Sequence, residues 1–298
     1  MRRVILTGGT GFIGRACVAP LLARGLEVHI LSRHSFEASP FVTSHMVDFF
    51  DVASVSRIMQ TLSAEFLIHA AWDVSTGQFW ADRNNFAWLG ASTLLLDAFV
   101  SFGGKRAIGI GSCAEYGNAE TRHVEDDEAT PASPYGYCKH GLQKLFTAAA
   151  GAGISTVWAR LFYPYGDYEK ENRLIPSVIR ALRAGQPFKC TEGTQLRDFI
   201  HVQDVGEAIV SCLEAKQVCG IVNICTGEAV SVREVISLIA AEFNALGLVE
   251  FGAIPMNPHE PKAMVGSATR LRQEVNFSPR IGLGEGVTRT IKFWRQAI

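Results

Sequence analysis

A tyrosine and a lysine four residues apart, Tyr135 and Lys139, form the pair with the clearest chemical potential in the sequence. On a helix, residues at positions i and i+4 lie on the same face, one turn apart. A lysine ammonium beside a phenol favours the phenolate, so Lys139 should lower the pKa of Tyr135 from its usual value of about 10. Tyr135 could then exchange a proton with a substrate hydroxyl or carbonyl near neutral pH. Because the spacing also arises by chance, this prediction depends on the rest of the chain.

A glycine-rich segment near the N-terminus predicts a dinucleotide-binding loop. The run Gly8-Gly9-Thr10-Gly11-Phe12-Ile13-Gly14 lies between a predicted strand at residues 3–6 and a predicted helix at residues 12–23. Glycines let the backbone approach a pyrophosphate, and the helix N-terminus offers N–H groups and a positive dipole end. Because a strand and a helix flank the loop as this motif requires, we predict that it binds a dinucleotide.

The residues after the second predicted strand, at 27–31, bear on the choice of cofactor. An Asp or Glu there would bind the ribose 2′-hydroxyl of NAD, but this chain has Ser32-Arg33-His34. The Arg33 guanidinium suits the 2′-phosphate of NADP through charge-assisted hydrogen bonds, although it could also be an ordinary surface side chain. The sequence therefore favours NADP(H), with NAD(H) as the alternative.

Predicted strands alternate with helices through the first half of the chain. Further strands are predicted at residues 66–71, 106–110 and 154–159, with a long helix at 84–102 and the helix of Tyr135 and Lys139 before the last strand. This alternation predicts an α/β fold with a Rossmann-type doubly wound parallel sheet. Beyond about residue 163 the elements shorten and prolines recur, which indicates a smaller C-terminal lobe. We predict a dinucleotide-binding domain over 1–162, a return segment near 198–225, and a mostly substrate-binding lobe over 163–298.

Composition argues against several functional classes. The chain is 48% hydrophobic with a formal net charge of −1, and its basic residues are scattered, which argues against a nucleic-acid surface. The seven cysteines lack CxxC spacing, so neither a disulfide framework nor a zinc site is expected. The N-terminus lacks a signal-peptide pattern, and no apolar run approaches the ~18 residues that span a bilayer. We expect a soluble cytoplasmic protein without a metal or a membrane partner. An acidic run at 125–128 is expected to be a solvated loop or to rim a substrate pocket.

Later motifs accompany the glycine loop, and together they resemble a known family. They are "IHAA" at 68–71, "GSCAEYG" at 111–117, "PYGYCK" at 134–139, "LRDFIHVQDV" at 196–205 and "NICTGE" at 223–228. In this order, over nearly the whole chain, they resemble the extended short-chain dehydrogenase/reductase family, in its NAD(P)-dependent nucleotide-sugar epimerase/dehydratase/reductase branch. The resemblance implies oxidoreductase chemistry on a nucleotide-diphosphate sugar.

Three groups of site residues follow from these motifs and from the resemblance. The catalytic residues would be Ser112, Tyr135 and Lys139. The cofactor would be bound by Gly8, Gly11, Phe12, Ile13, Gly14, Arg33, Asp48, Ala70, Tyr135 and Lys139. The substrate would be bound by Ser112, Arg173 and Arg197, with Arg197 at the diphosphate.

Departures from the family pattern restrict the reaction. A 4,6-dehydratase of this family usually carries Asp-Glu directly after the active-site Ser or Thr, whereas this chain has Cys113 and Ala114, so dehydration lacks its acid and base. Tyr163 replaces the asparagine that commonly follows "RxF", which alters the sugar pocket. Cys113 is expected to pack rather than react, and His69 is expected to be structural. Tyr137 competes with Tyr135 as the acid, but four residues after it stands a glycine, which offers no charge.

We therefore predict NADPH-dependent reduction of the 4-keto group of a nucleotide-activated 4-keto-6-deoxy sugar. Tyr135 would protonate the developing alkoxide, Ser112 would hydrogen-bond the carbonyl oxygen, and Lys139 would hold the nicotinamide ribose. The main alternative is an NAD-dependent nucleotide-sugar 4-epimerase; a non-catalytic NADP-binding regulator is a further one. The resemblance also implies a homodimer through the helices at 84–102 and 135–150. In this interface, or else in the core, would lie Phe86, Leu89, Leu96 and Phe99.

Overall fold

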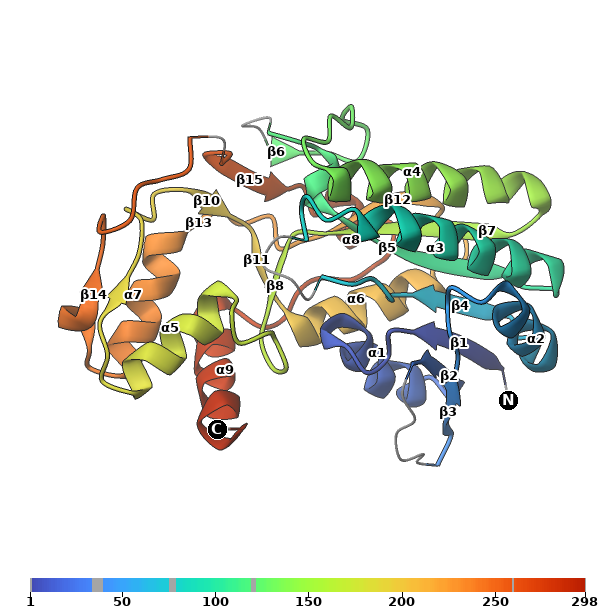
Figure 1. The fold of residues 1–298 in the computed structure, drawn as a ribbon, viewed down its shortest axis with the longest axis horizontal. Helices are drawn as coiled ribbons and strands as arrows, with labels where there is room; N and C mark the ends of the chain where they lie inside the picture. Colours follow the sequence, from blue (N-terminus) through green and yellow to red (C-terminus); the bar gives the residue numbers. More distant parts are fainter. Residues whose placement is uncertain (1, 34–39, 75–78, 119–121, 259, 298) are drawn as a thin grey trace.

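The computed structural model describes residues 2–33, 40–74, 79–118, 122–258 and 260–297 (Figure 1). His34, which follows Arg33 in the segment that bears on the choice of cofactor, lies outside the described residues.

A seven-stranded parallel sheet forms the centre of the larger lobe, in the order β12-β7-β5-β4-β1-β2-β3. Its strands read as apolar runs: the side chains of Val4, Ile5 and Leu6 are all fully buried. Such runs form where helices cover both faces of a parallel sheet. The strands are β1 (Arg3–Thr7), β2 (Glu27–Ser32), β3 (Val42–Met46), β4 (Phe66–His69), β5 (Arg106–Ser112), β7 (Ser155–Leu161) and β12 (Gly220–Ile224).

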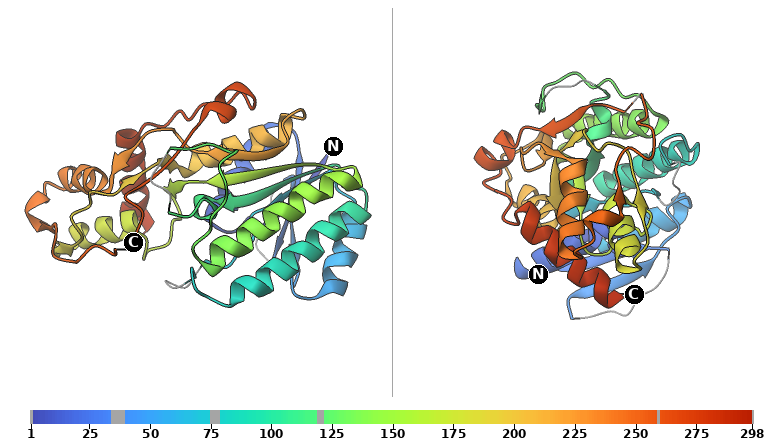
Figure 2. Two further views of the ribbon diagram at one scale, coloured as in Figure 1. Left: turned by 90° about the horizontal axis from the view of Figure 1, so that it is seen from above. Right: turned by 90° about the vertical axis from the view of Figure 1, so that its left-hand side faces the viewer.

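Helices cover both faces of this sheet (Figure 2). On one face α1 (Phe12–Ala23) and α6 (Val202–Glu214) bury a core with alternate residues of the strands. The opposite face carries α2 (Val52–Leu62), α3 (Asn84–Ser101) and α4 (Pro134–Ala149). This is the doubly wound Rossmann-type α/β fold that the sequence predicts, and the prediction is confirmed.

The smaller lobe has its own hydrophobic core. It is built around α5 (Leu174–Arg183), α7 (Val232–Glu242) and α9 (Leu283–Ala297), which share one cluster of buried side chains. A short two-stranded sheet, β9 (Phe188–Lys189) with β14 (Val249–Glu250), lies beside them. The smaller lobe lies beside the carboxyl edge of the large sheet (Figure 1).

Several short elements connect the two lobes. The parallel pair β8 (Tyr163–Tyr165) and β11 (Phe199–His201) runs between them. A four-stranded sheet has the order β13-β10-β15-β6. Its strands are β13 (Val230–Ser231), β10 (Leu196–Arg197), β15 (Ala263–Gly266) and β6 (Arg122–His123); the remaining elements are the helix α8 (Thr269–Gln273) and the 3-10 turns η1 (Cys113–Glu115), η2 (Ala150–Ala152) and η3 (Leu246–Leu248).

The large sheet contains two strands that the sequence does not predict, β3 and β12. After the first lobe the chain returns to the large sheet, where α6 packs directly on α1. A Cβ at Gly206 of α6 would lie 2.2 Å from the Ala16 carbonyl oxygen, so the helices approach closely only because this residue is glycine. The division into domains at 1–162 and 163–298 stays a prediction.

Two general features concern chemistry and environment. All seven cysteines are free thiols, and only Cys219 is exposed. Within the described residues, none of the helices is both long and apolar enough to cross a membrane.

Candidate functional site

The glycine loop joins β1 to α1 with a backbone that side chains would block. Gly8 has φ of 69°, and a Cβ there would lie 2.8 Å from the backbone of Ala70. A Cβ at Gly14 would lie 2.2 Å from the Gly8 carbonyl oxygen. Because these positions have no side chains, the N–H groups at the start of α1 stay accessible to a phosphate. The cradle therefore fits a dinucleotide pyrophosphate.

The two residues expected near the adenosine end of the cofactor lie on neighbouring strands. Arg33 follows β2, and Asp48 lies two residues beyond β3, which pairs with β2 up to Met46. Both side chains are exposed, and Asp48 accepts a hydrogen bond from the Phe50 backbone N–H at 3.0 Å. The sheet thus brings Arg33 and Asp48 to one edge, where their contacts with a cofactor stay predictions.

A cavity of about 630 Å³ lies between the carboxyl edge of the large sheet and the smaller lobe. Many of the predicted site residues line it: Phe12, Ile13, Ala70, Ser112, Tyr135, Lys139, Arg173 and Arg197. The others lie outside its lining: Gly8, Gly11, Gly14, Arg33 and Asp48. The cavity therefore joins the expected proton-transfer group to the expected anion-binding arginines.

Tyr135 and Ser112 meet although they come from different elements. The Ser133 hydroxyl caps α4 by accepting the Gly136 backbone N–H at 3.1 Å. The backbone N–H of Tyr135 donates to the Trp80 carbonyl oxygen at 3.1 Å. Its phenol lines the cavity together with Ser112 at the end of β5, whose hydroxyl counters part of the rise in the pKa of the phenol. Two hydroxyls thus point to one place, where they could hold a carbonyl or hydroxyl oxygen.

The expected effect of Lys139 on Tyr135 is wrong for this structure. Burial raises the pKa of Tyr135 above its usual value, while the Ser112 hydrogen bond and the Arg173 charge only partly oppose this. Lys139 Nζ lies 5.9 Å from the Tyr135 ring centroid, and its closer contacts are the Ile110 carbonyl oxygen at 2.9 Å and the Trp72 ring centroid at 3.9 Å. Burial also lowers the pKa of Lys139 to about 7. Tyr135 is therefore a neutral acid in the protein without ligands.

Aromatic rings enclose Tyr135 on three sides. The rings of Trp72, Phe79 and Trp80 lie edge-on to it, at centroid distances of 6.3, 5.0 and 5.4 Å. Edge-to-face contacts of this kind fix the orientation of a ring. They also remove water from the phenol, which explains why the pKa of Tyr135 is raised.

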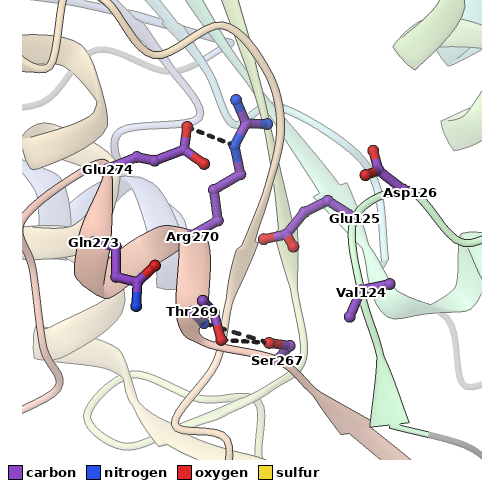
Figure 3. Close-up of a pocket in the computed structure, with 8 residues that line it drawn as sticks. All are labelled: Val124, Glu125, Asp126, Ser267, Thr269, Arg270, Gln273 and Glu274. Atoms are coloured by element: carbon purple, nitrogen blue, oxygen red, sulfur yellow. Dashed lines mark hydrogen bonds and ion pairs between the residues drawn. The ribbon is translucent and has the colours of Figure 1, made fainter.

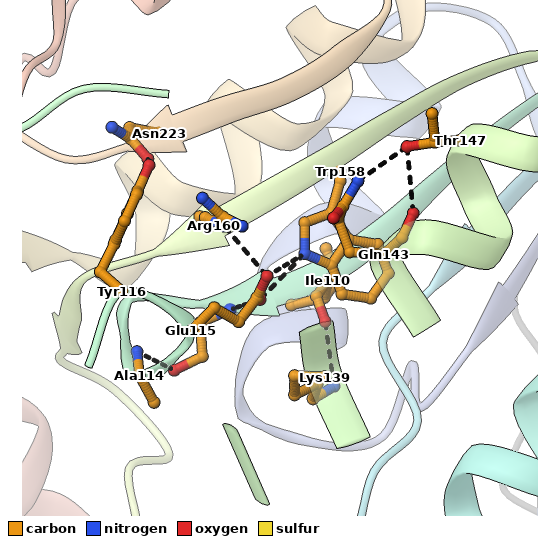
Figure 4. Close-up of polar contacts among 11 residues, drawn as sticks. Ile110, Ala114, Glu115, Tyr116, Lys139, Gln143, Thr147, Trp158, Arg160 and Asn223 are labelled. Carbon is orange, nitrogen blue, oxygen red and sulfur yellow. Dashed lines mark hydrogen bonds and ion pairs between the residues drawn. The ribbon is translucent and has the colours of Figure 1, made fainter. Parts of the chain in front are cut away.

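The only carboxylate of the segment 112–117 lies beneath the strand end and not in the cavity (Figure 4). Glu115 is fully buried and accepts the Ser112 backbone N–H at 2.8 Å. It also accepts Trp158 Nε1 at 2.9 Å and forms an ion pair with Arg160 Nε at 2.9 Å. This carboxylate holds the position of Ser112, and it is not placed to exchange protons with a ligand.

Arg197 and Arg173 come from separate segments of the chain, and both line the cavity. Arg197 is only 3% exposed, and its Nη2 donates to Glu260 Oε1 at 2.5 Å. Its Nη1 donates to the carbonyl oxygens of Leu196 and Pro261 at 2.8 and 2.9 Å. The guanidinium of Arg173, at the start of α5, lies 4.9 Å from the ring centroid of Phe79. A phosphate that reaches Arg197 would therefore compete with Glu260.

His69 and Cys113 have structural contacts, as expected. The ring of His69 connects the hydroxyls of Thr7 and Ser92, each at 2.8 Å, and burial lowers the pKa of His69 to about 3. Burial raises the pKa of Cys113 to about 12, so its thiol stays protonated. A protonated thiol is a poor base, which agrees with a packing role.

Glu125 and Asp126 of the acidic run line a different cavity (Figure 3). Glu125 accepts the Asn223 backbone N–H at 2.9 Å, and burial raises the pKa of its carboxyl. On the facing side, Arg270 and Glu274 form an ion pair at 2.9 Å. The run does not rim the cavity of Tyr135.

Several lining residues of the main cavity escape the sequence argument: Trp72, Phe79, Trp80, Glu169 and Glu260. Trp72 directly follows the "IHAA" segment, so the sequence could have predicted its position beside the cofactor segment. The others come from loops whose path toward the cavity depends on tertiary packing, and no local pattern marks them.

Comparison with known proteins identifies the family. The model of the NAD dependent epimerase/dehydratase family matches residues 4–225, from β1 to just beyond β12. The chain belongs to this family. It is accordingly a nucleotide-sugar-modifying enzyme of the extended short-chain dehydrogenase/reductase type.

The relatives match nearly the whole chain at low sequence identity. A UDP-glucose 4-epimerase of Corynebacterium glutamicum is 26% identical, over 93% of this chain and 91% of its own length. A dTDP-6-deoxy-L-talose 4-dehydrogenase (NAD(+)) of Aggregatibacter actinomycetemcomitans is 25% identical, over 89% of this chain and 99% of its own length. The solved structure of MoeE5 in complex with UDP-glucuronic acid and NAD has a TM-score of 0.88 and 27% identity, with both chains covered completely.

Proposed function

We propose that the chain transfers a hydride at C4 of a nucleotide-linked sugar and that its reaction is 4-epimerisation with bound NAD. The observation that supports the proposal is that Ser112, Tyr135 and Lys139 line one cavity at the carboxyl edge of the large sheet. The sequence favours one-way reduction, but the comparisons support the 4-epimerase more strongly, because a curated UDP-glucose 4-epimerase matches nearly the whole chain.

The residues would act on the C4 oxygen in both halves of the reaction. When bound, the nicotinamide supplies the hydride acceptor and donor. Tyr135 would take the proton of the C4 hydroxyl in the oxidative half and return it to the carbonyl oxygen in the reductive half. Ser112 would hold that oxygen by a hydrogen bond throughout. Because burial raises the pKa of Tyr135, a nearby positive charge is required before the phenolate can form.

Lys139 would provide part of that charge. Its Nζ lies 5.9 Å from the Tyr135 ring centroid and already lines the cavity. A bound dinucleotide would place ribose hydroxyls near Lys139, so the ammonium could exchange its bond with the Ile110 carbonyl oxygen for bonds to the ribose. The proposed role of Lys139 is therefore to hold the ribose and to stabilise the Tyr135 phenolate.

Reduction of a 4-keto-6-deoxy sugar is the second candidate, and Arg33 favours it. This residue stands where an acidic side chain would bind the 2′-hydroxyl of NAD. The curated relative that acts as a 6-deoxy-L-talose 4-dehydrogenase supports C4 chemistry on a 6-deoxy sugar. With NADPH, Tyr135 would donate its proton once to the C4 alkoxide, a direction that suits a phenol of raised pKa.

The nucleotide would be held through its diphosphate by Arg197 and Arg173, which line the cavity. A UDP-sugar is the first substrate class to test, because MoeE5 binds UDP-glucuronic acid. The same proposal includes the division into domains at residue 162. It also includes binding of the cofactor by the glycine loop, Arg33 and Asp48.

A homodimer through α3 and α4 is also proposed. Leu96 and Phe99 of α3 are buried in the core, whereas Phe86 is 59% exposed. The exposed apolar side chains of the two helices are Phe86, Leu94, Tyr137 and Leu145. Sedimentation of the purified protein tests this, and a monomer at micromolar concentration would refute it.

An assay of the purified protein separates the two reactions. UDP-glucose is incubated without added cofactor, and separately a nucleotide-4-keto-6-deoxy sugar is incubated with NADPH. Epimerisation predicts a C4 epimer in the first mixture without net cofactor consumption. Stoichiometric oxidation of NADPH in the second mixture alone would establish the reductase instead.

A further inference from the structure

A loop between β8 and α5, residues 166–173, lies against the helix that begins at the glycine loop. Its Tyr168, with φ of 65°, places its ring 4.2 Å from the guanidinium of Arg15 on α1. The same ring lies 4.7 Å from that of Phe293 on α9. These contacts hold the loop beside the first turn of α1, where the pyrophosphate of a dinucleotide would bind.

Glu169 of this loop lines the main cavity together with Phe12 and Ile13 of α1. Its Oε2 is buried and has no hydrogen-bond partner within the described part of the chain. Burial raises the pKa of Glu169 to about 8, although a hydrogen bond from the Gly166 backbone N–H and the charge of Arg173 partly oppose this. An unpaired buried carboxyl costs free energy in the folded protein, which suggests that its partner is a ligand.

The charged and titratable groups near Glu169 come from every element packed around it. The loop itself carries Asp167, Lys170 and Arg173, and of these the charge of Arg173 acts on Glu169. The groups that face other residues of the loop, or His201 beside it, are Arg15 of α1, Asp73 after β4, His201 before α6, and Glu285 and Arg289 of α9. Burial lowers the pKa of His201 to about 4, so this ring stays neutral above pH 6.

We propose that Glu169 binds the dinucleotide cofactor as a neutral acid and donates a hydrogen bond from its carboxyl to a diphosphate oxygen. Phosphate oxygens are acceptors only, so an ionised carboxylate at this place would repel them, whereas a protonated one complements them. The inference rests on the proposed dinucleotide site at α1, and it adds a residue that the glycine motif does not contain.

The experiment measures NADH binding to the complete protein by fluorescence, without any sugar, from pH 6 to pH 9. In the unaltered protein, binding should weaken above pH 8, by at most about tenfold for each pH unit. Glu169→Gln keeps a donor of the same shape but does not titrate. This variant should bind NADH at pH 6 as the unaltered protein does, and should lose the weakening that sets in above pH 8.

Two further variants complete the design. Glu169→Leu, which removes the donor, should weaken NADH binding at pH 6. Glu171→Gln alters an exposed neighbour that pairs with Arg180 and should keep the pH profile of the unaltered protein. Lys139 titrates equally in all of these proteins, so the difference between unaltered and Glu169→Gln profiles isolates Glu169.

The outcomes separate this inference from the proposed function. Identical pH profiles for the unaltered protein and Glu169→Gln would overturn the role of Glu169 while leaving C4 chemistry intact. Altered affinity for UDP, with NADH binding unchanged in every variant, would also overturn it and would assign Glu169 to the sugar nucleotide. Failure to bind NADH at any pH would overturn both proposals.

Discussion

The ion pairs at the two ends of the main cavity differ in whether a ligand can reach them. At the Ser112 end, Glu115 and Arg160 are 0% and 1% exposed, and their ion pair lies beneath the strand where no ligand reaches it. At the Arg197 end, the buried guanidinium pairs with Glu260, whose side chain is 33% exposed and lines the cavity. The first pair holds the strand end at Ser112, the proposed catalytic hydroxyl. The second would have to exchange its partner if a phosphate bound there.

This difference follows from what each end has to do. Proton transfer requires donors held within a few tenths of an ångström, so permanent buried partners are an advantage. Binding and release of a charged substrate require a site that stays satisfied when empty. A carboxylate on a partly exposed loop provides that at a small cost, because exposed ion pairs contribute little to stability.

The largest effect is expected at the Ser112 end, from Tyr135→Phe. Loss of the phenolic proton should lower kcat by about 10²–10⁴-fold while NADH affinity stays unchanged. Tyr137→Phe is the matched control, because this tyrosine lies on the same helix and is 62% exposed. Steady-state kinetics with the sugar substrate check both variants, and similar losses in the two would contradict the assignment of Tyr135.

The second effect concerns stability. Glu115→Gln leaves the buried Arg160 without its carboxylate, and breaking one partner of a buried pair costs about 3–5 kcal/mol in the free energy of unfolding. Urea denaturation measures this loss. The control Glu128→Gln alters an exposed side chain and should change the value by less than about 0.5 kcal/mol. An unchanged free energy of unfolding in Glu115→Gln would mean that this ion pair does not hold the strand end.

The third effect has the opposite sign and concerns the Arg197 end. Glu260→Gln removes the charge that competes with phosphate, so the affinity for UDP should rise by about fivefold, the factor that corresponds to roughly 1 kcal/mol. Glu192→Gln interrupts a more exposed ion pair, with Arg233, outside the lining of the cavity and should leave UDP affinity unchanged. Titration calorimetry gives both values. Weaker UDP binding by Glu260→Gln would show that Glu260 supports the ligand.

The fourth effect distinguishes the cofactors. Arg33→Ala should weaken NADPH binding by about tenfold and leave NADH binding unchanged if the guanidinium holds a 2′-phosphate. If the protein is an NAD-dependent epimerase, the substitution should change neither the NADPH nor the NADH affinity, because the exposed Arg33 would contact no 2′-phosphate. Fluorescence titration with the two dinucleotides separates these results.

The features that sequence reasoning recovered are those with local causes. The helix at Phe12–Ala23 and the glycine loop before it follow from periodicity and from backbone positions that exclude a Cβ. The motif residues around Ser112 and Tyr135 arrive at one cavity because parallel strands end at the same edge.

The features it missed depend on side-chain direction and on loops. The i, i+4 spacing placed Lys139 on the face of Tyr135, but the spacing cannot show that Nζ turns to the Ile110 carbonyl oxygen and the Trp72 ring. Glu260 reaches Arg197 from 63 residues away, and Glu169 reaches the cavity through a loop packed on α1. These contacts exist only after both lobes have folded.

The most direct test of hydride transfer at C4 uses UDP-glucose deuterated at C4, with the purified protein and NAD. Epimerisation through a 4-keto intermediate predicts, by NMR and mass spectrometry, a product with inverted configuration at C4 that retains the deuterium. Loss of the deuterium to solvent, or a product altered at another carbon, would contradict the proposal that Tyr135 and Ser112 act on the C4 oxygen.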